Sequence, residues 1–160
     1  MTIIGIDPGA KGGIATLFSD DPDPIVQPYS DMNLRDRLRT ETDDGWDTNN
    51  IIVYVEAVHA MKNDGKGKAF AFGRNYGKIL GILFCYIPEE QIKFVHPQTW
   101  KKEFGLINSK LDKKQKKLIS IAKAKELFPD TNLLPTHRCK KESDGMAEAL
   151  LIAEYGRRHF

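Results

Sequence analysis

The stretch from Ile3 to Gly9 constrains the fold of this chain more than any other. Its first four residues, Ile-Ile-Gly-Ile, are apolar apart from one glycine, as in a central strand that is buried on both faces. Asp7-Pro8-Gly9 follows and is a turn signal, because proline presets φ and glycine accepts a positive φ. A second apolar run covers residues 13–18, so we predict two strands joined by a turn, with Asp7 at its mouth. On this evidence alone, turn formation explains the aspartate as well as a function does.

Length and composition favour an ordinary globular protein. The 160 residues are enough for one domain with a sizeable core, so we expect a single domain over residues 1–160. Two cysteines are too few for a disulfide framework or a cysteine-based zinc site, and Cys85 lies in an apolar stretch that predicts a core position. We find no signal peptide and no apolar run near 18 residues, and therefore expect a cytoplasmic protein with no membrane partner.

Charge is distributed unevenly along the chain. The net charge is +2, but residues 1–50 hold four Lys or Arg against ten Asp or Glu, a net of −6. Residues 101–125 hold nine Lys against two acids, a net of +7. Such a basic segment suits a polyanionic partner, although a solvated helix face explains it too.

A second strand, over residues 51–58, also carries an acid. This run is β-branched and nearly all apolar, as expected for a strand covered on both faces, and Glu56 interrupts it. An unpaired carboxylate buried there would cost several kcal/mol, so Glu56 should have a cation, a hydrogen-bonding partner or a raised pKa. An ion pair with a Lys or Arg, or a position at the exposed end of the strand, is the structural alternative.

The remaining pattern predicts a layered α/β structure. The expected elements are a strand at 25–27, a short helix at 33–39, a loop at 40–50, a Gly- and Lys-rich connector at 61–68, a helix at 70–86, a strand at 92–95 and a short helix opened by Pro97. Within the helix at 70–86, Gly73, Gly77 and Gly81 fall on one face. Their helix-breaking cost indicates close approach of another backbone, either the sheet of this chain or the same helix in a second subunit.

Two helices are expected in the last third of the chain. Asn108-Ser109 predicts the start of a helix over 110–127, with lysines opposite an apolar face. The residues expected on that apolar face are Leu118, Ile121, Ala122 and Leu127. A basic loop at 134–142 follows, and Ser143 then caps a helix over 144–158 that is apolar almost all round.

That final helix carries a pair of acids. Asp144 and Glu148 are four residues apart and so share one helix face. The helix dipole accounts for Asp144 but fades before Glu148, which is flanked by alanines and therefore needs a partner. Neighbouring parallel strands would bring Asp7 and Glu56 together, and a helix laid on the sheet would add the other two acids.

A cluster of carboxylates is stable only with cations, and ligands that are all oxygen favour Mg²⁺ or Mn²⁺. Two such ions about 4 Å apart clamp a phosphodiester and activate water for in-line attack. The Lys-rich segment and the basic loop would then hold the phosphate backbone.

These motifs together resemble a known family, the RuvC-type Holliday junction resolvases of the ribonuclease H-like superfamily. The chain is most similar to the branch found in bacteriophages and plant chloroplasts. The matching stretches are Ile4-Gly5-Ile6-Asp7-Pro8-Gly9 with Gly12-Gly13, Val55-Glu56, Phe72-Gly73 through Gly77 to Gly81-Ile82-Leu83, Val95-His96-Pro97-Gln98-Thr99-Trp100-Lys101, Lys117-Leu118-Ile119-Ser120 followed by Leu127-Phe128-Pro129, and Asp144-Gly145-Met146-Ala147-Glu148-Ala149-Leu150-Leu151-Ile152-Ala153.

The resemblance implies a five-stranded mixed sheet with helices on both faces, in a homodimer. It implies a crossover junction endodeoxyribonuclease that makes two symmetric nicks in a four-way DNA junction and leaves 5′-phosphate and 3′-hydroxyl ends. The implied catalytic residues, which are also the ligands of two Mg²⁺ or Mn²⁺ ions, are Asp7, Glu56, Asp144 and Glu148. Bacterial housekeeping members end with acids, or a His and an Asp, three residues apart. Here the spacing is four, so the separate roles of Asp144 and Glu148 stay open.

The resemblance also implies DNA contacts. In the family, the segment after the Glu strand reaches into the junction, which here makes Met61, Phe70 and Phe72 candidate wedges against unstacked bases. For Phe72 we expect core packing instead. Lys117 matches a basic family position near the scissile phosphate, although an exposed helix lysine explains it equally. The other basic candidates for DNA binding are Lys66, Lys68, Lys113, Lys114, Arg138, Lys140 and Lys141.

Three alternatives remain. Ribonuclease H-like nucleases of similar size cut RNA–DNA hybrids or process ribosomal RNA with a similar acidic cluster. A non-catalytic junction-binding module would bind branched DNA without cutting it. Nucleotide hydrolysis is suggested by Gly5-Ile6-Asp7-Pro8-Gly9, which also resembles the first phosphate loop of sugar kinases and actin-like ATPases. Those proteins need a second such domain, which 160 residues do not hold, and the P-loop motif G-x-x-x-x-G-K-[ST] is absent.

Overall fold

A computed structural model describes residues 1–42, 48–57 and 65–160, without the side chains of Asn49, Lys66 and Lys68. It contains a five-stranded sheet in the order β3-β2-β1-β4-β5. The strands are β1 (Thr2–Asp7), β2 (Gly13–Phe18), β3 (Ile25–Pro28), β4 (Ile51–Glu56) and β5 (Ile92–Val95). β1, β2 and β3 pair antiparallel, whereas β4 pairs parallel with both β1 and β5. The sheet is therefore mixed, as predicted.

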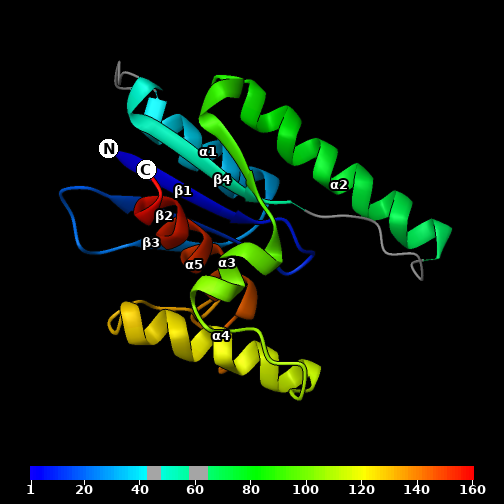
Figure 1. Ribbon diagram of the computed structural model, residues 1–160. Helices are drawn as coiled ribbons and strands as arrows, with labels where there is room; N and C mark the ends of the chain where they lie inside the picture. Colours follow the sequence, from blue (N-terminus) through cyan, green and yellow to red (C-terminus); the bar gives the residue numbers. More distant parts are fainter. Residues whose placement is uncertain (43–47, 58–64) are drawn as a thin grey trace.

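Helices cover both faces of this sheet (Figure 1). They are α1 (Asp31–Thr42), α2 (Lys66–Phe84), α3 (Pro97–Glu103), α4 (Lys113–Leu127) and α5 (Asp144–Arg158), with short 3-10 turns at Thr48–Asn50 and Glu89–Gln91. One hydrophobic cluster joins α1 and α2 to the sheet, and a second joins α5, α3 and α4 to the opposite face. The predicted α/β fold with helices on both sides of a five-stranded mixed sheet is confirmed.

The alternation of side chains along β1 and β4 decides which face the acids occupy. Ile4 and Ile6 pack in the cluster with α1 and α2, whereas Ile3 packs in the cluster with α5. Because every second residue of a strand points to the same face, Asp7 lies on the same side of the sheet as Ile3, which is the side covered by α5. Ile6 pairs with Val55 in the parallel ladder, so the next residue of each strand is an acid on the same face, Asp7 in β1 and Glu56 in β4.

Glycines let α5 approach the sheet closely. A Cβ on Gly5 would collide with the backbone of Ala149 and Ala153, and a Cβ on Gly145 would collide with the carbonyl of Lys11. Gly145 also bridges to Gly12 in the turn between β1 and β2. The start of α5 is thereby held beside the end of β1, where Asp7 lies.

The start and inward face of α4 differ from the sequence prediction. Asp112, rather than Asn108-Ser109, caps the helix through a reciprocal capping box with Gln115. Asn108 instead accepts a hydrogen bond from the backbone N–H of Lys110 in a local turn. Of the four residues predicted on the apolar face, Ile121 and Leu127 are partly buried against the core, whereas Leu118 is 56% exposed and Ala122 is also exposed. The buried residues of α4 are Ser120 and Ala124, whose small side chains allow close packing.

The glycine face of α2 does not pack on the sheet, which was one of the two alternatives predicted for it. A Cβ added to Gly73, Gly77 or Gly81 would meet no atom of the described residues within 4 Å, so the sheet of this chain does not cover these glycines. Cys85 follows one turn after Gly81 on the same open side and is exposed, which contradicts the predicted core position. Phe72 is half-buried and stacks on Tyr76 with ring centroids 6.3 Å apart, instead of entering either core cluster.

Two helices are longer than the sequence predicts. α2 starts at Lys66, inside the predicted connector, because lysine and alanine favour the helix enough to offset Gly67. α1 extends the expected 33–39 helix to Asp31–Thr42, where Leu34 and Leu38 anchor it in the core. β4 ends at Glu56, and Val58, the last residue of the predicted strand, lies outside the described residues. Over the described residues, none of the helices combines the length and apolar character needed to cross a membrane.

Candidate active site

Asp7, at the end of β1, is both a turn residue and a member of an acidic group. Its Oδ1 accepts a hydrogen bond of 2.9 Å from the backbone N–H of Gly9, as in an Asx turn. Burial, together with the nearby charges of Glu56 and Glu148, raises the pKa of Asp7 from 3.8 to about 7, although the Gly9 hydrogen bond and Lys101 oppose the shift. The positive charge near Asp7 is thus too small to keep its carboxylate ionised at acidic pH.

Glu56 lies at the end of β4 with only 7% of its surface exposed. The indole Nε1–H of the fully buried Trp100 donates a hydrogen bond of 3.1 Å to its Oε1. Burial raises the pKa of Glu56, and Glu148 adds to the rise, while Lys101 and the Trp100 hydrogen bond counteract it. The sequence-based expectation of a partner or a raised pKa thus describes Glu56 correctly, and the partner is an indole rather than a Lys or Arg.

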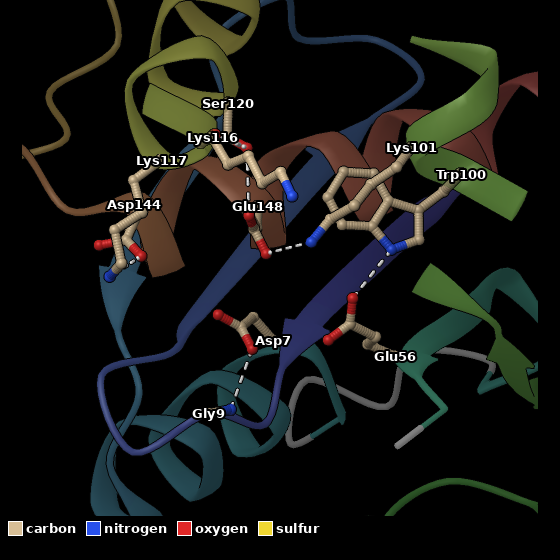
Figure 2. Close-up of polar contacts among 10 residues, drawn as sticks. All are labelled: Asp7, Gly9, Glu56, Trp100, Lys101, Lys116, Lys117, Ser120, Asp144 and Glu148. Atoms are coloured by element: carbon tan, nitrogen blue, oxygen red, sulfur yellow. Dashed lines mark hydrogen bonds and ion pairs between the residues drawn. The ribbon is translucent and has the colours of Figure 1, made fainter. Parts of the chain in front are cut away.

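Glu148 reaches the same region from the second turn of α5. The hydroxyl of Ser120 in α4 donates to its Oε1 at 3.1 Å, and the Lys101 ammonium in α3 lies 3.1 Å from its Oε2. Three different helices therefore meet at this one carboxylate. Figure 2 shows Asp7, Glu56 and Glu148 directed into a common space, with the Lys101 amine reaching into it.

Asp144 is oriented differently. Its carboxylate forms an ion pair of 2.5 Å with Lys117 of α4, at the edge of the space that the other three acids share (Figure 2). Both side chains are partly exposed. A hollow of about 410 Å³ opens beside Asp144, and Lys11, Tyr29 and Ser143 are also among its lining residues. Asp144 thus lies between Lys117 and this hollow, beside the other three acids.

The four predicted acids are consequently split, three together and one beside them. Across residues 1–42, 48–57 and 65–160, no three His, Cys, Asp or Glu side chains are placed closely enough to hold one metal ion. Lys101 and Lys117 place positive charge directly against Glu148 and Asp144.

The residues predicted to contact DNA are distributed over three elements. Lys113 and Lys114 are exposed in the first turn of α4, and Phe70 on α2 is 73% exposed. The basic loop before α5 exposes Arg138, Lys140 and Lys141. Lys66 and Lys68 belong to the first turn of α2, with side chains that are not described, and Met61 lies outside the described residues.

Sequence reasoning missed three residues that contact the acids, Trp100, Lys101 and Ser120. Each lies in a stretch that matches the family, which was the only signal available for them. Their contacts span 44, 47 and 28 positions of the chain, so no local spacing rule could have found them.

Comparisons with known proteins agree with this architecture. No protein-family model and no curated protein sequence matches the chain. Among solved structures, Thermus thermophilus RuvC in complex with a Holliday junction substrate superimposes with a TM-score of 0.56 and 17% identity, over 99% of this chain and 96% of that one. A second structure of Thermus thermophilus RuvC gives a TM-score of 0.52, also at 17% identity, over 99% and 97% of the two chains.

The chain has a RuvC-like fold. The superposition extends over nearly the whole length of both proteins, so it includes the strands and the helix that carry the acids. At 17% identity it shows the fold and leaves the activity to be argued from the site.

Proposed function

We propose that this chain is a metal-dependent endonuclease that resolves four-way DNA junctions. The observation that carries the proposal is the convergence of Asp7, Glu56 and Glu148 from β1, β4 and α5 at one end of the sheet. The RuvC-like fold supports it, because one structure with that fold was solved with a Holliday junction substrate. The proposed nuclease domain spans residues 1–160, in the branch of the family found in phages and chloroplasts.

The chemistry of the donor set suits a divalent cation of the Mg²⁺ or Mn²⁺ type, which would have to draw the acids closer together than they lie in the metal-free chain. Every candidate ligand is a carboxylate oxygen, which these ions prefer. Asp7 is half-buried near two other acids with a pKa of about 7, and the Lys101 ammonium takes the position of a cation beside Glu148. We assign Asp7, Glu56 and Glu148 to a site for two ions, with Asp144 as a further ligand once it leaves Lys117.

Metal ions in such a site lower the pKa of a bound water and neutralise the charge of the phosphate. The chain positions the groups around them. Gly9 and Trp100 orient the Asp7 and Glu56 carboxylates through their N–H groups, and Ser120 orients Glu148. The attacking water would lose a proton as its oxygen bonds to phosphorus, the bond from phosphorus to the 3′ oxygen would break, and that oxygen would take up a proton, which would leave 5′-phosphate and 3′-hydroxyl ends.

Basic residues beside the acids are proposed to bind the phosphate backbone. Lys117 lies against Asp144, and Lys113 and Lys114 continue along the exposed side of α4. Arg138, Lys140 and Lys141 add positive charge in the loop that leads into α5. Phe70, 73% exposed on α2, is proposed to stack on unpaired bases at the branch point together with Met61, and Lys66 and Lys68 from the same part of the sequence are proposed to bind phosphates.

We also propose a homodimer. Two symmetric nicks require two active sites, and one chain supplies one acidic cluster. The exposed face of α2 that carries Gly73, Gly77 and Gly81 has room for a second backbone, since a Cβ on any of the three would meet nothing within 4 Å in the part of the chain that the structure describes. Such an enzyme would work in the cytoplasm, that of the host if a phage encodes it.

A cleavage assay tests this function. A synthetic four-way junction and a linear duplex of the same sequence are incubated with the protein, in Mg²⁺ and in chelator. We expect paired nicks in the junction only, dependent on Mg²⁺. Asp7→Asn should lower cleavage by at least about a hundredfold with junction binding retained, because one ligand oxygen becomes an amide nitrogen.

The other outcomes identify the alternatives. Equal cutting of the linear duplex would indicate a general nuclease, and preferential cutting of an RNA–DNA hybrid or a ribosomal RNA precursor would indicate a ribonuclease. Junction binding without cutting at any Mg²⁺ concentration would indicate a binding module and contradict the proposal.

A further inference from the structure

Lys101 is a cation built into the acidic cluster. Its ammonium lies 3.1 Å from Oε2 of Glu148 and lowers the pKa of both Asp7 and Glu56, so its charge acts on all three converging acids. The side chain is only 29% exposed, and its ammonium lies 4.8 Å from the centre of the Trp100 ring. This lysine is therefore partly desolvated and held in place by two neighbours.

Glu148 has a protein partner for each of its oxygens. Ser120 donates to Oε1, and Lys101 occupies Oε2. A metal ion that takes Glu148 as a ligand must compete with one of them. The serine hydroxyl is neutral and compatible with a coordinated carboxylate, whereas the ammonium carries a charge that repels a divalent cation.

Lysine is suited to such a displacement. Its ammonium is a compact charge on a flexible stem of four carbons, which can swing away while the stem remains on an apolar surface. Here the ammonium itself lies over the Trp100 ring, 4.8 Å from its centre, so it can leave Glu148 and still lie against the ring. The ion pair can thus open without disturbing the hydrogen bond from Trp100 to Glu56.

We infer that Lys101 is an internal counter-cation that holds the acidic cluster together in the metal-free protein and leaves Glu148 when a divalent ion binds. The inference rests on the proposed metal site. Lys101 then stabilises the metal-free fold and weakens the affinity for metal, so metal binding and the Lys101–Glu148 ion pair exclude each other.

Metal titration of Lys101→Met tests this without DNA or cleavage. Methionine keeps an unbranched apolar stem on Trp100 but removes the charge. The full-length protein is stripped with chelator and titrated with Mn²⁺ by calorimetry. Lys102→Met is the matched control, since Lys102 is the next residue of α3, is exposed, and its replacement changes the net charge equally.

We expect Lys101→Met to bind Mn²⁺ about tenfold more tightly than the wild type, because both the competition and the repulsion are lost. Lys102→Met should stay within about twofold of the wild type. Thermal unfolding gives a second readout. In chelator, Lys101→Met should melt a few degrees below Lys102→Met, and Mn²⁺ should raise its melting temperature by more.

Lys101→Arg covers the case in which the methionine variant does not fold. Arginine keeps the charge and binds a carboxylate with a planar fork, so its Mn²⁺ affinity should be equal to or weaker than that of the wild type. An affinity above the wild type for Lys101→Arg would overturn the inference.

The remaining outcomes separate this inference from the proposed function. Equal or weaker Mn²⁺ binding by Lys101→Met than by the wild type would overturn the inference alone, because the metal site would still exist. Absence of Mn²⁺ binding to the wild type and to every variant would overturn the metal site and the inference together.

Discussion

The Asp7 carboxylate accepts a hydrogen bond within its own turn and at the same time faces two other acids. The turn interpretation of Asp7 is therefore confirmed, and its part in an active site stays a prediction that the neighbouring acids support. A turn aspartate at the surface would keep an ordinary pKa, but burial and like charges raise the pKa of this one to about 7. The energetic cost of keeping Asp7 in this position is the clearest residue-level sign of a functional site.

That pKa predicts how stability depends on pH in the metal-free protein. Because the folded-state pKa of about 7 lies above the usual 3.8, the folded chain binds this proton more tightly than the unfolded chain. The resulting stabilisation is fully present below about pH 4 and is lost as the pH rises to about 7.

Asp7→Asn lacks this titration. We expect its free energy of unfolding in chelator, measured by urea denaturation relative to the wild type, to rise by about 2 to 3 kcal/mol between pH 5 and pH 8. A difference between the two proteins that stays constant over this range would show that Asp7 is ionised throughout.

Asp7 and Glu56 could be predicted as site candidates because each follows an apolar run that is typical of a buried strand. An acid at the end of an apolar strand is visible in one sequence, and two parallel neighbours bring such acids together. The partners were not predictable, because Trp100 and Lys101 approach through tertiary packing of α3 across 44 and 47 residues.

At the level of elements, predictability followed the strength of the local signals. α5 has the bounds expected from its Ser143 cap and its continuous apolar sequence. α4 begins three residues later than expected because two potential caps compete, and only Asp112 forms a capping box with Gln115. The glycines of α2 predicted that another backbone approaches one face of the helix. They did not predict that this face is open within the described part of the chain.

The open face predicts an unusual response to substitution. Gly77→Ala should raise the free energy of unfolding by about 0.5 to 1 kcal/mol in dilute protein, because alanine favours a helix and its Cβ meets nothing within 4 Å. Gly13→Ala is the opposite control, since its Cβ would lie 2.6 Å from the Cα of Met146. Urea denaturation measures both, and a destabilised Gly77→Ala in monomeric protein would show that this face is not open.

Over the whole molecule, acidic and basic groups adjoin at one end of the sheet. The acids come from β1, β4 and α5, and the lysines of α4 contact them through the pair between Lys117 and Asp144 (Figure 2). The charge imbalance in the sequence predicted a polyanion-binding segment but not its position next to the acids. That position follows from the packing of α4 on α5.

This arrangement predicts a salt effect on DNA binding. The double replacement of Lys113 and Lys114 by Ala should weaken junction binding and reduce the slope of log affinity against log salt by about 2, since each lost phosphate contact removes about 0.9. Lys93→Ala, on the edge strand β5, is the exposed control and should leave the slope unchanged. Fluorescence anisotropy at several salt concentrations measures the slopes, and an unchanged slope in the double variant would place the DNA elsewhere.

The most direct test is crystallographic. Crystals of the wild-type protein soaked in Mn²⁺ should show anomalous density within about 2.2 Å of carboxylate oxygens of Asp7 and of at least one of Glu56 and Glu148, with the Lys101 ammonium moved off Glu148. Asp7→Asn crystals treated in the same way should lose that density. A wild-type crystal with saturating Mn²⁺ and no density among these acids would contradict the claim that they form a metal-dependent active site.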